Sequence, residues 1–217
     1  MKNILKKTIA LAAALVLTTA ASHASLFHVN INTAALNLPP ANLGAPFSLD
    51  FQFNDGGVLG NNTATVSNFT YGTGAATGSA VTLGGALGNI GSTVTFNNST
   101  SFQELYQTFT PGSVLGFDVS LSQFVDGPTP DSFAVSILDQ NLFNIPTTAA
   151  GDVLLHADIT STGPISISSI ETGSGTGSYG GIDVTSVTAV PEPTTACVGF
   201  GLAMAGALAR RRRAARA

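Results

Sequence analysis

The long central part of this sequence contains no lysine and no arginine. The chain of 217 residues has eight of these basic residues, and all of them lie near its two ends: Lys2, Lys6, Lys7, Arg210, Arg211, Arg212, Arg213 and Arg216. Binding to a polyanion depends on basic side chains that displace its counterions. We therefore expect no direct binding of nucleic acid or of an acidic polysaccharide by the central part.

Cysteine is almost absent as well. The single cysteine, Cys197, lies in an apolar segment near the C-terminus, so the central part contains no disulfide. Eleven of the twelve acidic residues lie in the central part, which therefore has a net charge of −11 with its histidines neutral. We expect no ion pair between its side chains, and its stability must come from packing and hydrogen bonds.

The first 24 residues have the three parts of a secretory signal peptide. The lysines at positions 2, 6 and 7 form a positive start, residues 8–17 form an apolar run, and Ser22-His23-Ala24 provides a small residue at each end of a cleavage site. We expect the Sec translocon to export the chain and the peptide to be cleaved after Ala24. A buried N-terminal core helix is the alternative interpretation.

The C-terminal segment 191–217 also has three parts. Pro191, Glu192 and Pro193 come first, the uncharged segment 194–209 follows, and the cluster of four arginines at 210–213 comes next. As a helix, the uncharged segment would span roughly 24 Å, against about 30 Å for the hydrocarbon core of a bilayer. This predicts a short transmembrane helix whose arginines stay in the cytoplasm while the central part lies outside.

In this order and at these lengths, the three parts resemble the PEP-CTERM sorting domain. The resemblance covers only residues 191–217, and the start of the helix, Thr194-Thr195-Ala196-Cys197, is more polar than is usual in that family. The resemblance implies that an exosortase recognises Pro191-Glu192-Pro193 and processes the chain in a Gram-negative bacterium that makes exopolysaccharide. The protein would then reside transiently in the inner membrane before it reaches the cell surface or extracellular matrix. An ordinary linker before a helix is the alternative.

The central part, residues 25–190, shows the periodicity of strands. Apolar residues alternate with polar ones from Phe27 to Asn32 and from Phe47 to Phe53. Further strands are predicted near residues 64–70, 79–83, 92–96, 102–109, 114–121, 132–138, 153–159, 164–170 and 182–187. Turn clusters rich in Asn, Asp, Gly and Pro separate them, and the proline-containing stretch 36–46 is expected to lack regular structure.

This pattern predicts one all-β domain, an antiparallel β-sandwich between the signal peptide and the C-terminal helix. Either a jelly-roll-like or an Ig-like topology fits the spacing of the strands. The alternative is a disordered, low-complexity matrix protein, which the glycine content favours and the regular apolar alternation opposes.

The central part offers little material for catalysis. It has no Lys, Arg or Cys, and its two histidines, His28 and His156, lie on the polar faces of alternating strands. We therefore expect a protein that is not an enzyme. Calcium is the cofactor to consider, because carboxylates in turns are its usual ligands. Asp126 and Asp131 are the best candidates, followed by Asp50 and Asp55, and solvated turn residues are the alternative.

The leading hypothesis is an exported structural protein of the cell surface or extracellular matrix, associated with exopolysaccharide and biofilm. The first alternative is an adhesin resembling a carbohydrate-binding module, in which Tyr71, Tyr106 or Tyr179 would stack on sugar rings. The second is a hydrolase that uses a pair of carboxylates, whose partners in space a sequence does not reveal.

Overall fold

The computed structural model describes residues 24–39, 41–57, 60, 62–124, 129–147, 152–159, 165–170 and 182–190. Within these ranges the chain forms short strands and two 3-10 helices. In chain order they are β1 (Ala24–Asn32), η1 (Ala34–Asn37), η2 (Ala41–Gly44), β2 (Phe47–Asn54), β3 (Ala64–Thr70), β4 (Ala75–Ala76), β5 (Val81–Leu83), β6 (Leu87–Gly88), β7 (Val94–Phe96), β8 (Phe102–Thr110), β9 (Val114–Ser122), β10 (Asp131–Leu138), β11 (Leu155–Ile159), β12 (Ser166–Ile170) and β13 (Asp183–Val190).

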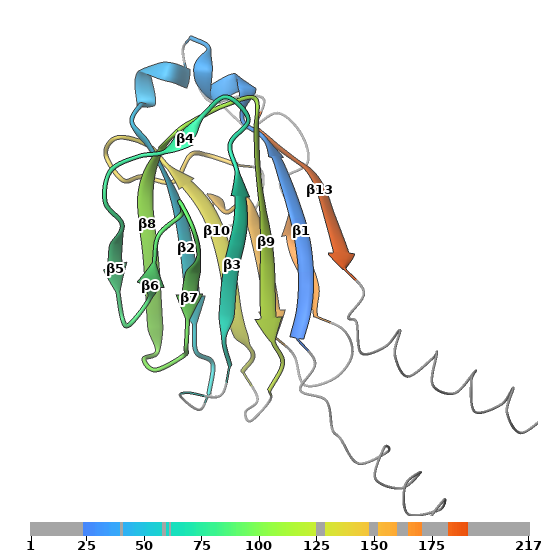
Figure 1. The fold of residues 1–217 in the computed structure, drawn as a ribbon. Helices are drawn as coiled ribbons and strands as arrows, with labels where there is room; N and C mark the ends of the chain where they lie inside the picture. Colours follow the sequence, from blue (N-terminus) through green and yellow to red (C-terminus); the bar gives the residue numbers. More distant parts are fainter. Residues whose placement is uncertain are drawn as a thin grey trace, which may run out of the picture.

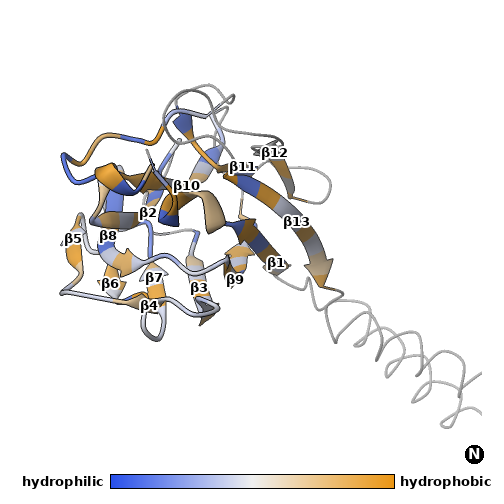
Figure 2. Ribbon diagram, turned by 90° about the horizontal axis from the view of Figure 1, so that it is seen from above, coloured by the Kyte–Doolittle hydropathy of each residue, from blue (hydrophilic) through white to orange (hydrophobic). Residues whose placement is uncertain are grey.

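The strands form two sheets that pack face to face (Figures 1 and 2). Sheet A has the order β13-β1-β9-β3-β7-β6, and sheet B has the order β12-β11-β10-β2-β8-β4, with β5 also paired to β8. Every pairing between the described strands is antiparallel. The predicted all-β antiparallel sandwich is therefore confirmed.

The chain passes back and forth between the sheets, so several neighbouring strands, such as β1 and β9 or β2 and β10, are distant in sequence. β1 pairs with β9 on one side and with β13 on the other. In the β1–β13 pair, Leu26 lies opposite Val190 and Asn32 lies opposite Asp183. The start of β1 and the end of β13 therefore meet at one end of the sandwich, which we call the termini pole. The two 3-10 helices follow β1 at the opposite end (Figure 1).

The core lies between the inner faces of the two sheets and is built around phenylalanine. Phe51 of sheet B is fully buried. Its ring centroid lies 5.6 Å from that of Phe117, 6.0 Å from that of Phe69 and 6.2 Å from that of Phe133. Burial of each such side chain contributes roughly 1.5–3 kcal/mol, which lets the domain fold without a disulfide.

Two parts of the fold differ from the prediction. The stretch 36–46 contains the second half of η1 and all of η2. In η1 the Leu36 N–H donates to Thr33 O (3.0 Å), the Leu38 N–H donates to Ala35 O (3.1 Å), and Leu36 is buried. The strands β4 and β6 were not predicted, because two residues are too few to show a period.

Both predicted membrane segments fall where the structure gives no description. Residues 1–23 of the predicted signal peptide and all of the segment 191–217 lie outside the described ranges. Within the described part of the chain, no helix is both long enough and apolar enough to cross a membrane.

Candidate functional site

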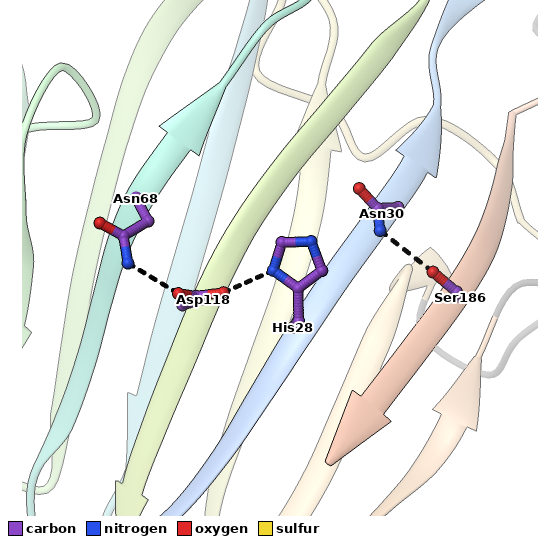
Figure 3. A network of polar contacts seen from close by, with 5 residues as sticks. All are labelled: His28, Asn30, Asn68, Asp118 and Ser186. Carbon is purple, nitrogen blue, oxygen red and sulfur yellow. Dashed lines mark hydrogen bonds and ion pairs between the residues drawn. The ribbon is translucent and has the colours of Figure 1, made fainter. Parts of the chain in front are cut away.

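The outer face of sheet A carries a network of three side chains from three neighbouring strands (Figure 3). The Nδ1 atom of His28 on β1 lies 2.6 Å from Oδ1 of Asp118 on β9. Asn68 on β3 donates from Nδ2 to the other carboxylate oxygen, Oδ2, over 2.7 Å. Asn68 has a φ of 55°, at the point where the β3–β9 register shifts. Asparagine tolerates this left-handed backbone better than most residues.

This network corrects one expectation from the sequence. Partial burial acts to raise the pKa of Asp118, but the hydrogen bonds from Asn68 and His28 and the charge of His28 outweigh it and hold the pKa below its usual value. His28 and Asp118 form an ion pair when His28 is protonated, so the expectation of no side-chain ion pair was wrong. Their side chains are 46% and 18% exposed, and an exposed pair contributes at most about 1 kcal/mol.

The outer face of sheet B carries a second network, centred on Gln52. The Nε2 group of Gln52 donates to Asp50 Oδ2 over 2.9 Å and to Glu104 Oε1 over 3.4 Å. In the β2–β8 pair, Gln52 lies opposite Glu104 and Asp50 lies opposite Tyr106. Because opposite residues of an antiparallel pair share a face, all four side chains lie on the outer face of sheet B.

Asp50 is the unusual member of this second network, because it is an acid with only 1% of its surface exposed. Its Oδ1 atom accepts no hydrogen bond from any described residue. Burial, reinforced by the negative charge of Glu104 and partly offset by the hydrogen bond from Gln52, raises the pKa of Asp50 from 3.8 to about 7. Near neutral pH this carboxyl group is therefore protonated in a large fraction of molecules.

Asp131, one of the two residues predicted to bind calcium, lies at the start of β10 and is buried. Its Oδ1 accepts a hydrogen bond from the Gly56 N–H over 2.8 Å, and its Oδ2 accepts from Nδ2 of Asn62 (2.8 Å) and of Asn98 (3.1 Å). Asn98 also donates to Asp55 Oδ1 over 2.9 Å. This carboxylate therefore fastens the loop after β2 and the loop after β7 to the start of β10.

The structure brings together only some of the predicted calcium ligands. Asp55 and Asp131 share Asn98 as a donor, whereas Asp50 lies on the outer face of sheet B, and Asp126 is outside the described residues. Among the described residues, no group of three or more His, Cys, Asp or Glu side chains is placed to hold a metal ion. The calcium site remains a prediction from the sequence.

The three tyrosines proposed to stack on sugars have different positions. The Tyr71 hydroxyl donates to Ile90 O over 2.6 Å, and its ring stacks on Phe69 with centroids 6.3 Å apart. Burial raises the pKa of Tyr71. This side chain belongs to the core and does not form a sugar platform. Tyr106 is half-buried on the outer face of sheet B, and Tyr179 lies outside the described residues.

The second histidine lies close to a carboxylate on its own strand. His156 Nε2 is 3.8 Å from Asp158 Oδ1, and the side chains are 33% and 42% exposed. Both residues lie on β11 at the outer face of sheet B, as the alternation of the sequence predicts.

The chain matches no protein-family model, no curated protein and no solved structure. Its function must therefore be inferred from its own residues and geometry. The residues that sequence reasoning missed are Asn68, Asp118, Gln52 and Glu104. Alternation places each on or beside a polar face, but it does not show which strands become neighbours.

Proposed function

We propose that this chain is an exported, non-enzymatic structural protein of the cell surface or extracellular matrix, associated with exopolysaccharide and biofilm. Its C-terminal segment would hold it briefly in the inner membrane until an exosortase processes it at Pro191-Glu192-Pro193. The observation that carries the proposal is the charge distribution, because every Lys and Arg lies at an end of the chain and the acidic body has none. By the positive-inside rule, both ends stay in the cytoplasm while the body lies outside.

The pairing of β1 with β13 supports this topology. Leu26 and Val190 lie opposite each other on adjacent strands, about 5 Å apart in the hydrogen-bonding direction. The signal peptide and the C-terminal segment therefore join the body at the same pole. Ends that leave the body at the same pole can both reach one membrane while the body stands on its outer side.

The position of the Pro-Glu-Pro motif suits recognition by an enzyme. β13 ends at Val190, so the motif begins at the next residue. Two prolines lack backbone N–H donors and favour an extended chain, so we expect Glu192 to form a stiff acidic group between the folded domain and the membrane. A processing enzyme in the membrane would meet this group without unfolding the sandwich.

The test is fractionation of cells that produce the parent chain, the variant Glu192→Ala or the matched control Thr195→Ala. We expect the parent and the control to reach the surface or medium without their arginine cluster. The variant should stay in the inner membrane with its C-terminus intact. Processing of Glu192→Ala at the parent rate would refute the role of the motif.

A second candidate function is binding of a neutral glycan, as in an adhesin. It is favoured by the outer face of sheet B, where Tyr106 lies beside the Gln52–Glu104 hydrogen bond and could combine ring stacking with polar contacts. A glycan array should show binding that Tyr106→Ala removes and that Tyr71→Phe retains, because the Tyr71 hydroxyl is bonded to Ile90 O. Absence of binding by the parent chain would eliminate this candidate.

A further inference from the structure

β13 forms one edge of sheet A and pairs there with β1. Among the described strands, none pairs with its other side. An edge strand presents a row of free N–H and C=O groups that can pair with another chain. β13 has eight residues, whereas the edge strands β4 and β6 have two each, β5 has three and β12 has five. A very short edge strand offers few backbone groups to another chain. Among the described edge strands, β13 is therefore the best suited to pairing.

The composition of β13 also favours pairing. Proteins commonly block a long edge with lysine, proline or an inward-pointing charge. β13 has none of the three in its interior, and its one charged residue, Asp183, is its first residue. Its remaining residues are mostly β-branched, with Val at 184, 187 and 190 and Thr at 185 and 188, which suits extended structure. Five of the eight, residues 185, 186, 188, 189 and 190, are exposed.

We propose that β13 pairs antiparallel with β13 of a second copy of this chain, so that sheet A continues across a two-fold axis. In the proposed register the two-fold axis passes at Val187, which lies opposite the core residue Val29 of β1, in the regular part of β13 that follows the irregularity at Thr185 in the β1–β13 pairing. Ser186 then faces Thr188 of the second copy on the outer surface, twice by symmetry, and their hydroxyls can bond to each other. Parallel pairing in register would instead place Asp183 against Asp183, which is unfavourable.

The antiparallel arrangement links assembly to processing, a consequence that rests on the proposed function. Two copies paired in this way have their termini poles at opposite ends of the dimer, because β13 runs toward that pole in each copy. Copies anchored in one membrane by segment 191–217 all point the same way and therefore do not form this pair. Removal of the C-terminal segment releases them to assemble outside the membrane.

The pairing is tested on the full chain in mild detergent by sedimentation, with charged variants at the two facing positions. The variants are Ser186→Lys with Thr188→Lys, and Ser186→Glu with Thr188→Glu. Each should self-associate about tenfold more weakly than the parent, because two pairs of like charges face each other across the axis. An equimolar mixture should recover the parent's affinity, because each lysine then faces a glutamate.

The matched control is Thr63→Lys with Thr95→Lys, which adds the same charge at exposed positions of the same chain away from β13. It should associate like the parent. A monomeric parent, lysine variants that associate like the parent, or a mixture that associates no better than either variant alone would each overturn the proposal.

The detergent measurement is independent of processing, so the two proposals can fail separately. A chain that pairs in detergent but is never processed in cells would refute the proposed function and leave the pairing intact. A chain that is processed but stays monomeric would refute the pairing alone. In membranes containing the unprocessed chain, cross-linking should yield monomers, and a β13-dependent dimer there would refute the link to processing.

Discussion

Replacement of Asp50 by asparagine should stabilise the protein at alkaline pH and have little effect at acidic pH. The folded protein raises the pKa of Asp50 from 3.8 to about 7, chiefly because the side chain is buried. The folded state therefore binds a proton more tightly than the unfolded state does. The stability that protonation contributes is fully present below pH 3.8 and is lost as the pH rises through about 7.

The magnitude follows from the size of this shift. Each pKa unit corresponds to about 1.4 kcal/mol, so ionised Asp50 costs the folded state up to about 4 kcal/mol above pH 8. An asparagine at this position would keep the shape of the side chain and an oxygen that accepts the hydrogen bond now donated by Gln52 Nε2 to Asp50 Oδ2. The variant should therefore be more stable than the parent by up to about 4 kcal/mol at pH 8 and similar to it at pH 4.

Urea denaturation of both proteins between pH 4 and pH 8 measures this difference directly. Asp158→Asn provides the control, because it removes one negative charge from a side chain of sheet B that is 42% exposed. A difference between Asp50→Asn and the parent that stays constant across this pH range would refute the reasoning. So would a variant that is less stable than the parent at pH 8.

Three further predictions concern the core, the loops and the surface. Phe51→Ala should lower the free energy of unfolding by about 3–5 kcal/mol, as measured by urea denaturation, because the ring contacts three other phenylalanines; a loss below 1 kcal/mol would contradict this packing. Asp131→Ala should lower the free energy of unfolding by about 3 kcal/mol in the same assay, because three N–H donors lose their acceptor. An unchanged urea midpoint would show that this carboxylate does not stabilise the loops. A double-mutant cycle on His28 and Asp118 should give a coupling below about 1 kcal/mol that 1 M salt removes, and a larger, salt-insensitive coupling would indicate a buried pair.

The strands themselves could be predicted from the sequence, because each long strand has one face in the core. In β2, the residues Phe47, Leu49, Phe51 and Phe53 are all buried, and their period of two is visible in the sequence. The same alternation located β3, β8 and β9 to within one residue at each end. The 3-10 helices depend on local hydrogen bonds, which leave no such period, and the two-residue strands are too short to show one.

The polar networks could not be predicted in the same way. His28 and Asp118 are 90 residues apart, and only the antiparallel β1–β9 register places them opposite each other. Asp50 occupies a polar position of an alternating strand, which predicts exposure to water. The structure instead buries it together with Ser48 and Ser136, on the central strands β2 and β10 of sheet B. Alternation shows which face of a strand is polar but not how far that face is covered.

The central claim is that the two charged ends stay in the cytoplasm while the acidic body is exported and then released from its C-terminal segment. The most direct test is the intact mass of the protein recovered from the surface and medium of the producing cells. The predicted mass is that of a chain that begins at Ser25 and lacks Arg210 to Arg213. A cytosolic protein that retains both Lys2 and the arginine cluster would contradict the account.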